Sequence, residues 1–421
     1  MIMKRLIEKL SLVTSHPLAR GSAVVLIGSM AANVGAYFYH VVVGRLLGPE
    51  QYGELASLYS LSYLLNVPSL VIQTVIAKYV SAYKAKKENG KAKELVITAT
   101  QSMGYWMIAI LILTVPLYRF FVQYLHVTNY WSVVYVFIGS GIVFLGTVIT
   151  GTLQGYQQFT ELMVFSNIGV VLRLIGGFIG ASYSVAATAF ANALTAFIAY
   201  VLSFIPLRFL RASTRQKTGL TKRDIGTFAV PSLLCILGIT SLYNTDIMLV
   251  KHYFSSYEAG MYAALSMMGK VIFFASSSFS YVLFPVVAER SHVGGRSDRL
   301  VYISLAAVAC ISLGITVGYY IFPSVALGLL FGSSYAGASG YLGLFGIFIS
   351  FFSLSNILST TLLGMGNKSV WMFTVSFSLL QILGIMAVHD SLRSVLYLNI
   401  GVSTALFMML LVYYRHAVKK H

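Results

Sequence analysis

Twelve long apolar stretches divide the chain, and they constrain its fold more than any other feature. A stretch of about 20 apolar residues can cross the ~30 Å hydrocarbon layer of a bilayer as a helix, because a helix satisfies its own backbone hydrogen bonds. The predicted spans are residues 22–43, 53–77, 95–117, 132–152, 161–182, 184–206, 227–250, 258–285, 300–322, 336–356, 369–388 and 393–414. Only 10% of the residues are charged, whereas soluble domains average about 25%. The sequence therefore predicts an all-α integral membrane protein.

The second half of the chain repeats the plan of the first. Residues 44–57 read GRLLGPEQYGELAS and residues 251–264 read KHYFSSYEAGMYAA, which brings Gly53 into register with Gly260, 207 residues later. Residues 151–157, GTLQGYQ, match residues 360–366, TTLLGMG, at an offset of 209. Both copies run in the same direction through six spans, so we expect two six-helix lobes related by an axis along the membrane normal, as in parallel-repeat transporters.

The repeat sets the expected domain organisation. The N-terminal lobe is predicted over residues 22–207 and the C-terminal lobe over residues 225–414, joined by a basic cytoplasmic linker at 208–224 and followed by a cytoplasmic tail at 415–421. Residues 1–21 place Lys4, Arg5 and Lys9 opposite apolar side chains. This pattern favours an amphipathic segment in the cytoplasmic interface, the alternative being a disordered basic tail.

The basic residues are distributed to one side of the predicted membrane. Most of the 29 Lys and Arg residues fall in the N-terminus, the C-terminus and alternate connections, whereas the other set of connections holds only Arg45, Arg119, Lys251 and Arg393. By the positive-inside rule, we expect both termini and the long basic connections on the cytoplasmic side of the membrane. The net charge of +17 is thus explained by topology and by contact with membrane lipids, and nucleic acid is not an expected partner.

Two basic residues lie deep inside predicted spans. Arg173 is near the middle of the fifth span and Lys270 is inside the eighth, one in each half. A cation at this depth costs at least ~2.5–3.5 kcal/mol, so it normally faces a hydrated cavity or the bundle interior and marks a functional path. The alternative is a local structural pair, of Arg173 with helix carbonyls or Asn167 and of Lys270 with Asp246.

Polar residues on the first helix of each half extend this candidate site. Asn33, Tyr37 and His40 are spaced four and three apart and share a helix face, which is either a cavity wall or an interhelical contact. Their counterparts in the second half are Thr240, Asn244 and Ile247, with Asp246 beside them. Asp246 could bind a coupling cation, although an ion pair with Lys270 or Lys251 is the favoured interpretation. The candidate substrate-binding residues are Arg173, Lys270, Asn33, Tyr37, His40, Asn244 and Asp246.

The sequence contains no recognisable catalytic chemistry. There is no GxxxxGK[ST], HExxH, CxxC pair or GxSxG motif, and the longest polar connection is too short to form a catalytic domain with its own core. Cys235 and Cys310 lie in apolar spans and are interpreted as packing residues. We therefore expect no enzyme activity, no cofactor and no metal site.

Four segments carry a resemblance to a known family. Residues 44–58 (GRLLGPEQYGELASL), 153–159 (LQGYQQF), 244–265 (NTDIMLVKHYFSSYEAGMYAAL) and 329–338 (LLFGSSYAGA) occur in this order across most of the chain. They resemble the polysaccharide biosynthesis (oligosaccharide flippase) family of the multidrug/oligosaccharidyl-lipid/polysaccharide (MOP) exporter superfamily. The resemblance implies a MATE-like bundle that moves lipid-linked oligosaccharides from the cytoplasmic to the outer leaflet. Polysaccharide assembly proteins are the further partners it suggests.

Two other classes of function stay open at this point. A multidrug or small-solute antiporter of the same superfamily would be expected to offer membrane-embedded carboxylates, for which Asp246 is the candidate. A scaffold or polymerase of a polysaccharide assembly complex is the third class, but a polymerase needs a sizeable external loop. The buried cations favour an anionic cargo such as a lipid-linked sugar diphosphate, with Arg173 suited to phosphate geometry.

Overall fold

The structure, a computed structural model, describes residues 17–420 except for 213, 217, 219–221, 293–297, 366 and 368. In this part of the chain all regular elements are helices and no strand occurs. Those of the first half are α2 (Pro17–Leu65), α3 (Val67–Ala85), α4 (Asn89–Tyr124), α5 (Tyr130–Gly155), α6 (Phe159–Ala181), α7 (Val185–Leu202) and the 3₁₀ helix η1 (Ile205–Ala212). Those of the second half are α8 (Lys222–Leu242), α9 (Thr245–Tyr253), α10 (Ser256–His292), α11 (Asp298–Ile321), α12 (Pro323–Leu330), the 3₁₀ helix η2 (Ser333–Ala338), α13 (Ser339–Gly364), α14 (Val370–Ala387) and α15 (Leu392–Lys420). Most of the predicted interfacial segment, residues 1–21, lies outside the described residues.

The helices agree with the twelve predicted spans. Among the described residues, ten helical stretches are long and apolar enough to cross a membrane, or eleven if the bent pair α8 and α9 forms one span. One of the ten, Ile27–Ala85, has 59 residues. At 1.5 Å per residue it would be roughly 90 Å long, about three times the thickness of the hydrocarbon layer. This stretch therefore accounts for two crossings, which completes the twelve.

Breaks in the helical backbone divide the long stretches, and two of the three lie next to a proline. In α2 the helix is interrupted at Gly48, whose φ of 72° is accessible to glycine at little cost, and Pro49 follows. A second break separates α2 from α3 at Asn66, two residues before Pro68. The pair α8 and α9 is bent by 43°. The first break marks the end of one membrane crossing and the start of the next.

The chain forms two compact units. The first comprises Met1–His40, Pro68–Tyr118 and Val134–Ile225, and the second comprises Val41–Val67, Arg119–Val133 and Gly226–His421. The second unit thus contains two segments from the first half of the sequence. Helix α2 contributes to both units, with the change at His40.

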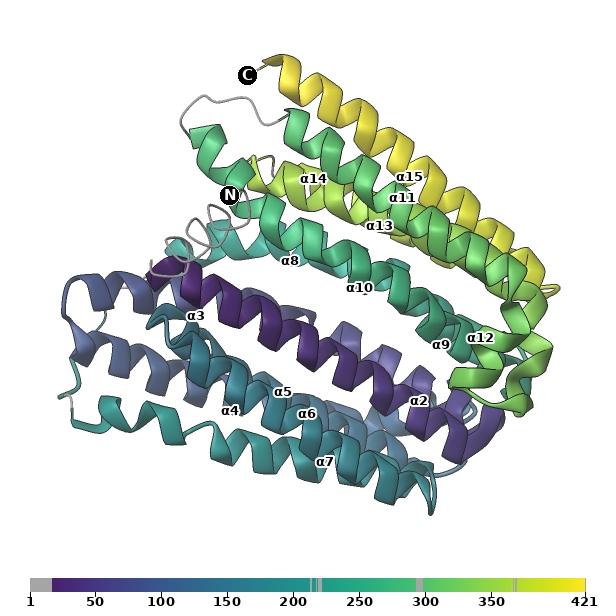
Figure 1. Ribbon diagram of the computed structural model, residues 1–421. Coiled ribbons are helices and arrows are strands. Elements are labelled where there is room, and N and C mark those ends of the chain that lie inside the picture. The colour runs from purple at the N-terminus through teal and green to yellow at the C-terminus, as the bar shows by residue number, and fades with distance from the viewer. Residues whose placement is uncertain are drawn as a thin grey trace, which may run out of the picture. The chain divides into compact units, whose positions relative to one another are not determined.

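The first unit is built around α3, α4 and α5, with α6 and α7 forming an antiparallel hairpin. Its core includes the buried side chains of Ile76, Val80, Val148 and Leu153. Helices α6 and α7 lie side by side (Figure 1), and a Cβ atom on Gly180 would approach the Thr188 backbone to 2.6 Å. Small residues permit this close helix contact, as is usual within membranes.

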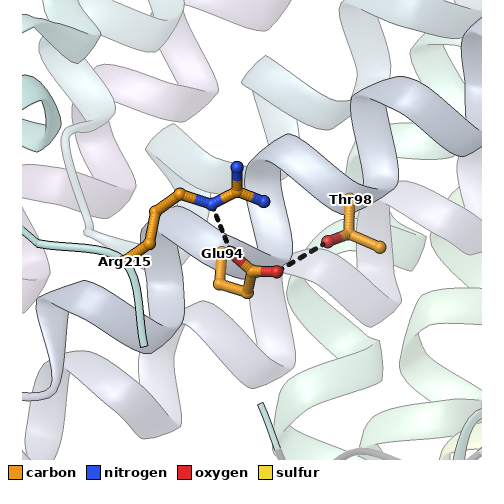
Figure 2. A network of polar contacts seen from close by, with 3 residues as sticks. All are labelled: Glu94, Thr98 and Arg215. Atoms are coloured by element: carbon orange, nitrogen blue, oxygen red, sulfur yellow. Dashed lines mark hydrogen bonds and ion pairs between the residues drawn. The ribbon is translucent and has the colours of Figure 1, made fainter. Parts of the chain in front are cut away.

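The predicted linker, residues 208–224, contacts the start of α4 within this unit. Arg215 Nε donates a hydrogen bond to a carboxylate oxygen of Glu94 at 2.6 Å, and Thr98 Oγ1 donates to the other at 3.4 Å (Figure 2). The backbone N–H of Gln216 donates to the carbonyl of Gly90 at 3.2 Å. The described part of the linker is therefore anchored to the first unit by side-chain and backbone contacts.

Helix α13 is the centre of the second unit. It packs against α10, α11 and α15, and Phe345, Phe348, Phe352 and Leu358 on it are almost fully buried. Helices α11, α13, α14 and α15 run side by side in the green to yellow part of Figure 1. Because α13 is covered on several sides, its apolar residues form the core rather than a lipid-facing surface.

The repeated sequence motif contacts itself inside the second unit. A Cβ atom on Gly53 would lie 2.6 Å from the backbone nitrogen of Gly260, and one on Gly260 would overlap the carbonyl group of Pro49. Gly53 and Gly260 are the two residues that the repeat aligns 207 positions apart. The absence of side chains here lets α2 and α10 approach until their backbones touch.

A second set of contacts joins the same α2 segment to the end of α12. Arg45 donates hydrogen bonds to the carbonyls of Leu330 at 2.6 Å and Gly328 at 3.3 Å, and also to that of Leu329. These are carbonyls that a helix C-terminus leaves without intrahelical partners, and a cation is favoured there. The hydroxyl of buried Tyr335 donates to the Gly44 carbonyl at 2.8 Å. Residues 44–53 are thus tied firmly to the second unit.

Candidate functional site

In the first unit, the guanidinium of Arg173 lies over an aromatic ring. Its Cζ is 4.3 Å from the centroid of the Tyr39 ring. Tyr39 is 1% exposed, and Asn192 Nδ2 donates a hydrogen bond to its hydroxyl at 2.6 Å. Helix α6 thus supplies the cation, α2 supplies the ring, and α7 supplies the amide that orients the ring.

In the second unit, the ammonium of Lys270 contacts two aromatic rings. Its Nζ is 5.1 Å from the centroid of Tyr63 and 6.0 Å from that of Tyr243. Lys270 is 8% exposed and is placed by α10. A cation over an aromatic face gains about 0.5–1 kcal/mol at an exposed site and about 2 kcal/mol or more when desolvated. Both cations singled out in the sequence therefore contact aromatic rings, although Lys270 is buried and Arg173 is half-buried.

Lys270 and Tyr63 are also partners in the repeat. They are 207 residues apart, the same offset that aligns Gly53 with Gly260. Tyr63 lies ten positions after Gly53, and Lys270 lies ten positions after Gly260. The second unit therefore holds two contacts between repeat-equivalent positions, a glycine pair and the Tyr63–Lys270 pair, on the same two helices.

Asp246 is the acceptor at one end of a buried hydrogen-bond chain. Tyr262 Oη donates to Asp246 Oδ2 at 2.6 Å, Asn399 Nδ2 donates to Tyr262 Oη at 2.8 Å, and Gln381 Nε2 donates to Asn399 Oδ1 at 2.9 Å. Gln381 Nε2 also donates to the Leu242 carbonyl, next to the bend between α8 and α9. The four residues of this hydrogen-bond chain come from α9, α10, α14 and α15, so the hydrogen bonds hold these four helices together at one point.

We predict that Tyr262→Phe lowers the stability of the protein. The hydroxyl that it removes is the partner of two groups on buried residues, the Asp246 carboxylate and the Asn399 amide, and a buried polar group left without its partner costs about 1–3 kcal/mol. Thermal unfolding of the purified protein in detergent measures this loss as a lower Tm. The control is Tyr257→Phe. Tyr257 is 45% exposed, and its hydroxyl makes only a long contact of 3.5 Å with the Ser334 carbonyl. Equal Tm values for the two variants would contradict the role given to this chain.

The other predicted site residues fall on α2 and around the α8–α9 bend. Asn33 and Tyr37 are half-buried, and His40 is buried beside Tyr39 with the two rings edge to face. Asn244 is fully buried, and its Nδ2 donates to the Thr240 carbonyl at 2.9 Å. Asn167, the alternative partner suggested for Arg173, donates to the carbonyls of Gly28 and Met163.

The ion pair expected for Asp246 stays a prediction. Besides the bond from Tyr262, its Oδ1 accepts the backbone N–H of Ile247 at 2.9 Å, and Lys270 lies within electrostatic range of it. Lys251, the other suggested partner, donates to Ser256 Oγ at 2.7 Å. The carboxylate is therefore held by neutral hydrogen-bond donors in addition to the field of Lys270.

Seven aromatic and amide residues of the site were not predicted from the sequence. They are Tyr39, Tyr63, Tyr243, Tyr262, Asn192, Gln381 and Asn399. One signal was available: Asn192 and Asn399 are separated by the repeat offset of 207 residues, and each donates to a tyrosine hydroxyl. An amide recurring at equivalent positions of two apolar helices indicates a conserved internal contact within the repeat.

No group of three or more His, Cys, Asp or Glu side chains that could hold a metal ion occurs among the described residues.

The profile of the family described as "Polysaccharide biosynthesis protein" matches residues 42–340. The chain belongs to this family. No curated protein matches the sequence.

Solved structures with the same fold include transporters of several kinds. An inward-facing multidrug resistance MATE family transporter of the MOP superfamily superposes with a TM-score of 0.77 at 13% identity, over 92% of this chain and 96% of the other. The lipid II flippase MurJ, in an inward closed conformation, gives a TM-score of 0.69 at 13% identity, over 93% and 87%. A MOP superfamily transporter from Pyrococcus furiosus, whose binding pocket is described as reversed in polarity, gives 0.65 at 13% identity, over 97% of each chain. This member of the polysaccharide biosynthesis family is therefore a multi-pass membrane protein with the two-lobed MOP fold.

Proposed function

We propose that this protein is a flippase for lipid-linked oligosaccharides. It moves polyprenyl-diphosphate-linked sugar units from the inner to the outer leaflet of the plasma membrane for polysaccharide biosynthesis, by alternating access. The observation that carries the proposal is Lys270, a cation that is 8% exposed in an apolar helix of a chain from the polysaccharide biosynthesis family. A lipid-linked sugar diphosphate is the cargo of that pathway that combines negative charge with an apolar tail.

The environment of the two cations supports an anionic cargo. Aromatic rings hold Lys270 and Arg173 through their π faces, and a ring stabilises a cation without neutralising its charge. An incoming diphosphate can therefore add its own charge-assisted contacts, which are strongest where water is excluded. Arg173 offers a planar fork of donors for phosphate oxygens and Lys270 offers a point charge.

The proposed cycle uses the two lobes predicted from the repeat, residues 22–207 and 225–414. Rocking of one lobe against the other changes the side from which the cations are accessible, as in parallel-repeat carriers. The polyprenyl tail stays in the lipid, because moving its many methylene groups into water would cost about 0.8 kcal/mol each. Both termini and the basic connections are on the cytoplasmic side in this proposal. No cofactor is required.

Reconstitution into vesicles tests the proposal. Purified protein is placed in liposomes that contain a polyprenyl-diphosphate oligosaccharide with a labelled sugar, and the fraction that an external glycosidase removes is followed with time. We expect protein-dependent exposure of the diphosphate-linked sugar and little movement of the same sugar on a neutral lipid. Transport of cationic drugs, with no movement of the diphosphate lipid, would contradict the proposal and favour the antiporter alternative, with the Asp246 carboxylate as its binding group.

A further inference from the structure

Two aromatic rings from different elements contact the cation in α10. Tyr63 and Tyr243 reach the Lys270 ammonium from α2 and from the bend between α8 and α9. Both tyrosines are half-buried. Their contacts with Lys270 lie wholly within the second unit.

The Tyr243 ring is fixed in place by other aromatic residues. Its centroid is 5.5 Å from that of Phe273 and 5.1 Å from that of Phe352, and the two phenylalanine rings are 5.6 Å apart. Such pairs add about 0.5–1.5 kcal/mol beyond the apolar area that they bury. Phe273 is three residues after Lys270 on α10, so the same helix that carries the cation also orients the ring beneath it.

The Tyr63 ring comes from the α2 segment that is tightly attached to the second unit. Gly53 on the same helical stretch touches the backbone of α10 near Gly260. Because that contact leaves no room for sliding, the position of Tyr63 relative to α10 is set by backbone packing. The two rings around Lys270 are therefore held by independent parts of the structure.

The first unit also places a cation over a tyrosine ring. The Tyr39 ring, 4.3 Å from the Arg173 guanidinium, is fully buried and its hydroxyl accepts a hydrogen bond from Asn192. A ring that is locked in this way limits the orientations of a flexible cationic side chain. Less conformational entropy then remains to be lost when an anion binds.

We infer that Tyr63 and Tyr243 are positioning residues for substrate binding, and that they hold the Lys270 ammonium in place for a diphosphate. Tyr39 does the same for Arg173. This inference rests on the proposed flippase function and adds the residues that prepare the cations.

The test compares ring-retaining and ring-removing variants in the vesicle assay. Tyr63→Phe and Tyr243→Phe keep the π face, and we expect the apparent KM for the polyprenyl-diphosphate oligosaccharide to stay within about twofold of the parent. Tyr63→Leu and Tyr243→Leu remove the π face, and we expect the KM to rise by about 5- to 30-fold with a smaller change in the maximal rate. Tyr397→Leu, at a residue that is 57% exposed on α15, is the matched control and should leave the KM unchanged.

A graded series separates this role from simple packing. Phenylalanine analogues with increasing numbers of fluorine atoms at position 63 weaken the negative face of the ring while nearly keeping its size. We expect the KM to rise step by step along the series, with no parallel fall in Tm. A flat series, or Leu variants with normal KM, would overturn the inference.

The outcome for Lys270 itself distinguishes the two proposals. If Lys270→Ala abolishes transport while both Leu variants transport normally, the positioning role is wrong and the flippase proposal stands. If Lys270→Ala transports the diphosphate lipid as well as the parent, Lys270 does not bind the cargo, and this part of the flippase proposal is wrong together with the positioning role.

Discussion

Replacing Gly260 with alanine is expected to lower the Tm of the purified protein by at least about 2 °C. The added methyl group would overlap the carbonyl of Pro49, and all three atoms nearest to it belong to the backbone of that residue. A backbone cannot rotate away as a side chain can, and overpacking of this kind typically costs 1–3 kcal/mol. In domains of 150–250 residues, each kcal/mol corresponds to a shift of about 2–4 °C.

The same experiment on Gly53 tests the contact from its other side. A methyl group there would meet the backbone of Gly260 and Ala259 at 2.6–3.0 Å, so Gly53→Ala should also lower the Tm. Gly314→Ala is the control, because Gly314 lies inside α11 with nothing within 4 Å of its Cβ position. Alanine is the better helix former, so this variant should be neutral or slightly stabilising. Equal Tm values for Gly260→Ala and Gly314→Ala would show that the two repeat glycines do not touch in the protein.

Removing either Lys270 or Arg173 is expected to reduce transport of the diphosphate lipid at least about tenfold. A hydrogen bond to a charged group is worth about 1.5–3 kcal/mol, and 1.4 kcal/mol corresponds to a tenfold change. Lys270→Ala and Arg173→Ala each remove a cationic donor of such contacts to the diphosphate. Initial rates of sugar exposure in the vesicle assay, at a fixed concentration of reconstituted protein, measure the effect.

Conservative and remote variants serve as controls for this loss. Lys270→Arg and Arg173→Lys keep the charge and should retain part of the activity, with Arg173→Lys weaker because a point charge does not reproduce the planar fork. Lys78→Ala removes a cation from an exposed position on α3 and should transport normally. Equal losses in all three alanine variants would indicate that net charge, rather than binding at Lys270 and Arg173, governs transport.

The helices could be predicted from the sequence because the bilayer imposes a simple requirement on them. Each crossing needs a long apolar run, so the twelve spans follow from composition and length alone. The break at Gly48 could be foreseen in kind, since Gly-Pro between two apolar runs favours a turn. The break at Asn66 lies two residues before Pro68, and a proline in an apolar run favours such a break. The 43° bend between α8 and α9 has no such signal beside it and could not be placed in advance.

The ring contacts of Arg173 and Lys270 could not be predicted for a different reason. Carboxylates, amides and helix carbonyls are the partners that the sequence suggests for a cation, whereas these two contact Tyr39, Tyr63 and Tyr243. The chain has 28 tyrosines and 27 phenylalanines, so the presence of an aromatic residue near a cation carries little information. Only the packing of α2 against α10 selects Tyr63 among them. The repeat offset that aligns Tyr63 with Lys270 is visible in the sequence, but alignment alone does not show that two equivalent positions touch.

The most direct test of the account restores the charge at position 270 chemically. The chain has two cysteines, so Cys235→Ala and Cys310→Ser give a background in which Lys270→Cys is the single thiol. We expect this variant to transport poorly, and aminoethyl methanethiosulfonate, which rebuilds a cationic side chain on the thiol, to restore exposure of the diphosphate-linked sugar. The anionic sulfonatoethyl reagent should not restore it. Full transport by the unmodified Lys270→Cys variant, or equal restoration by both reagents, would contradict the claim that a buried cation on α10 binds the anionic cargo.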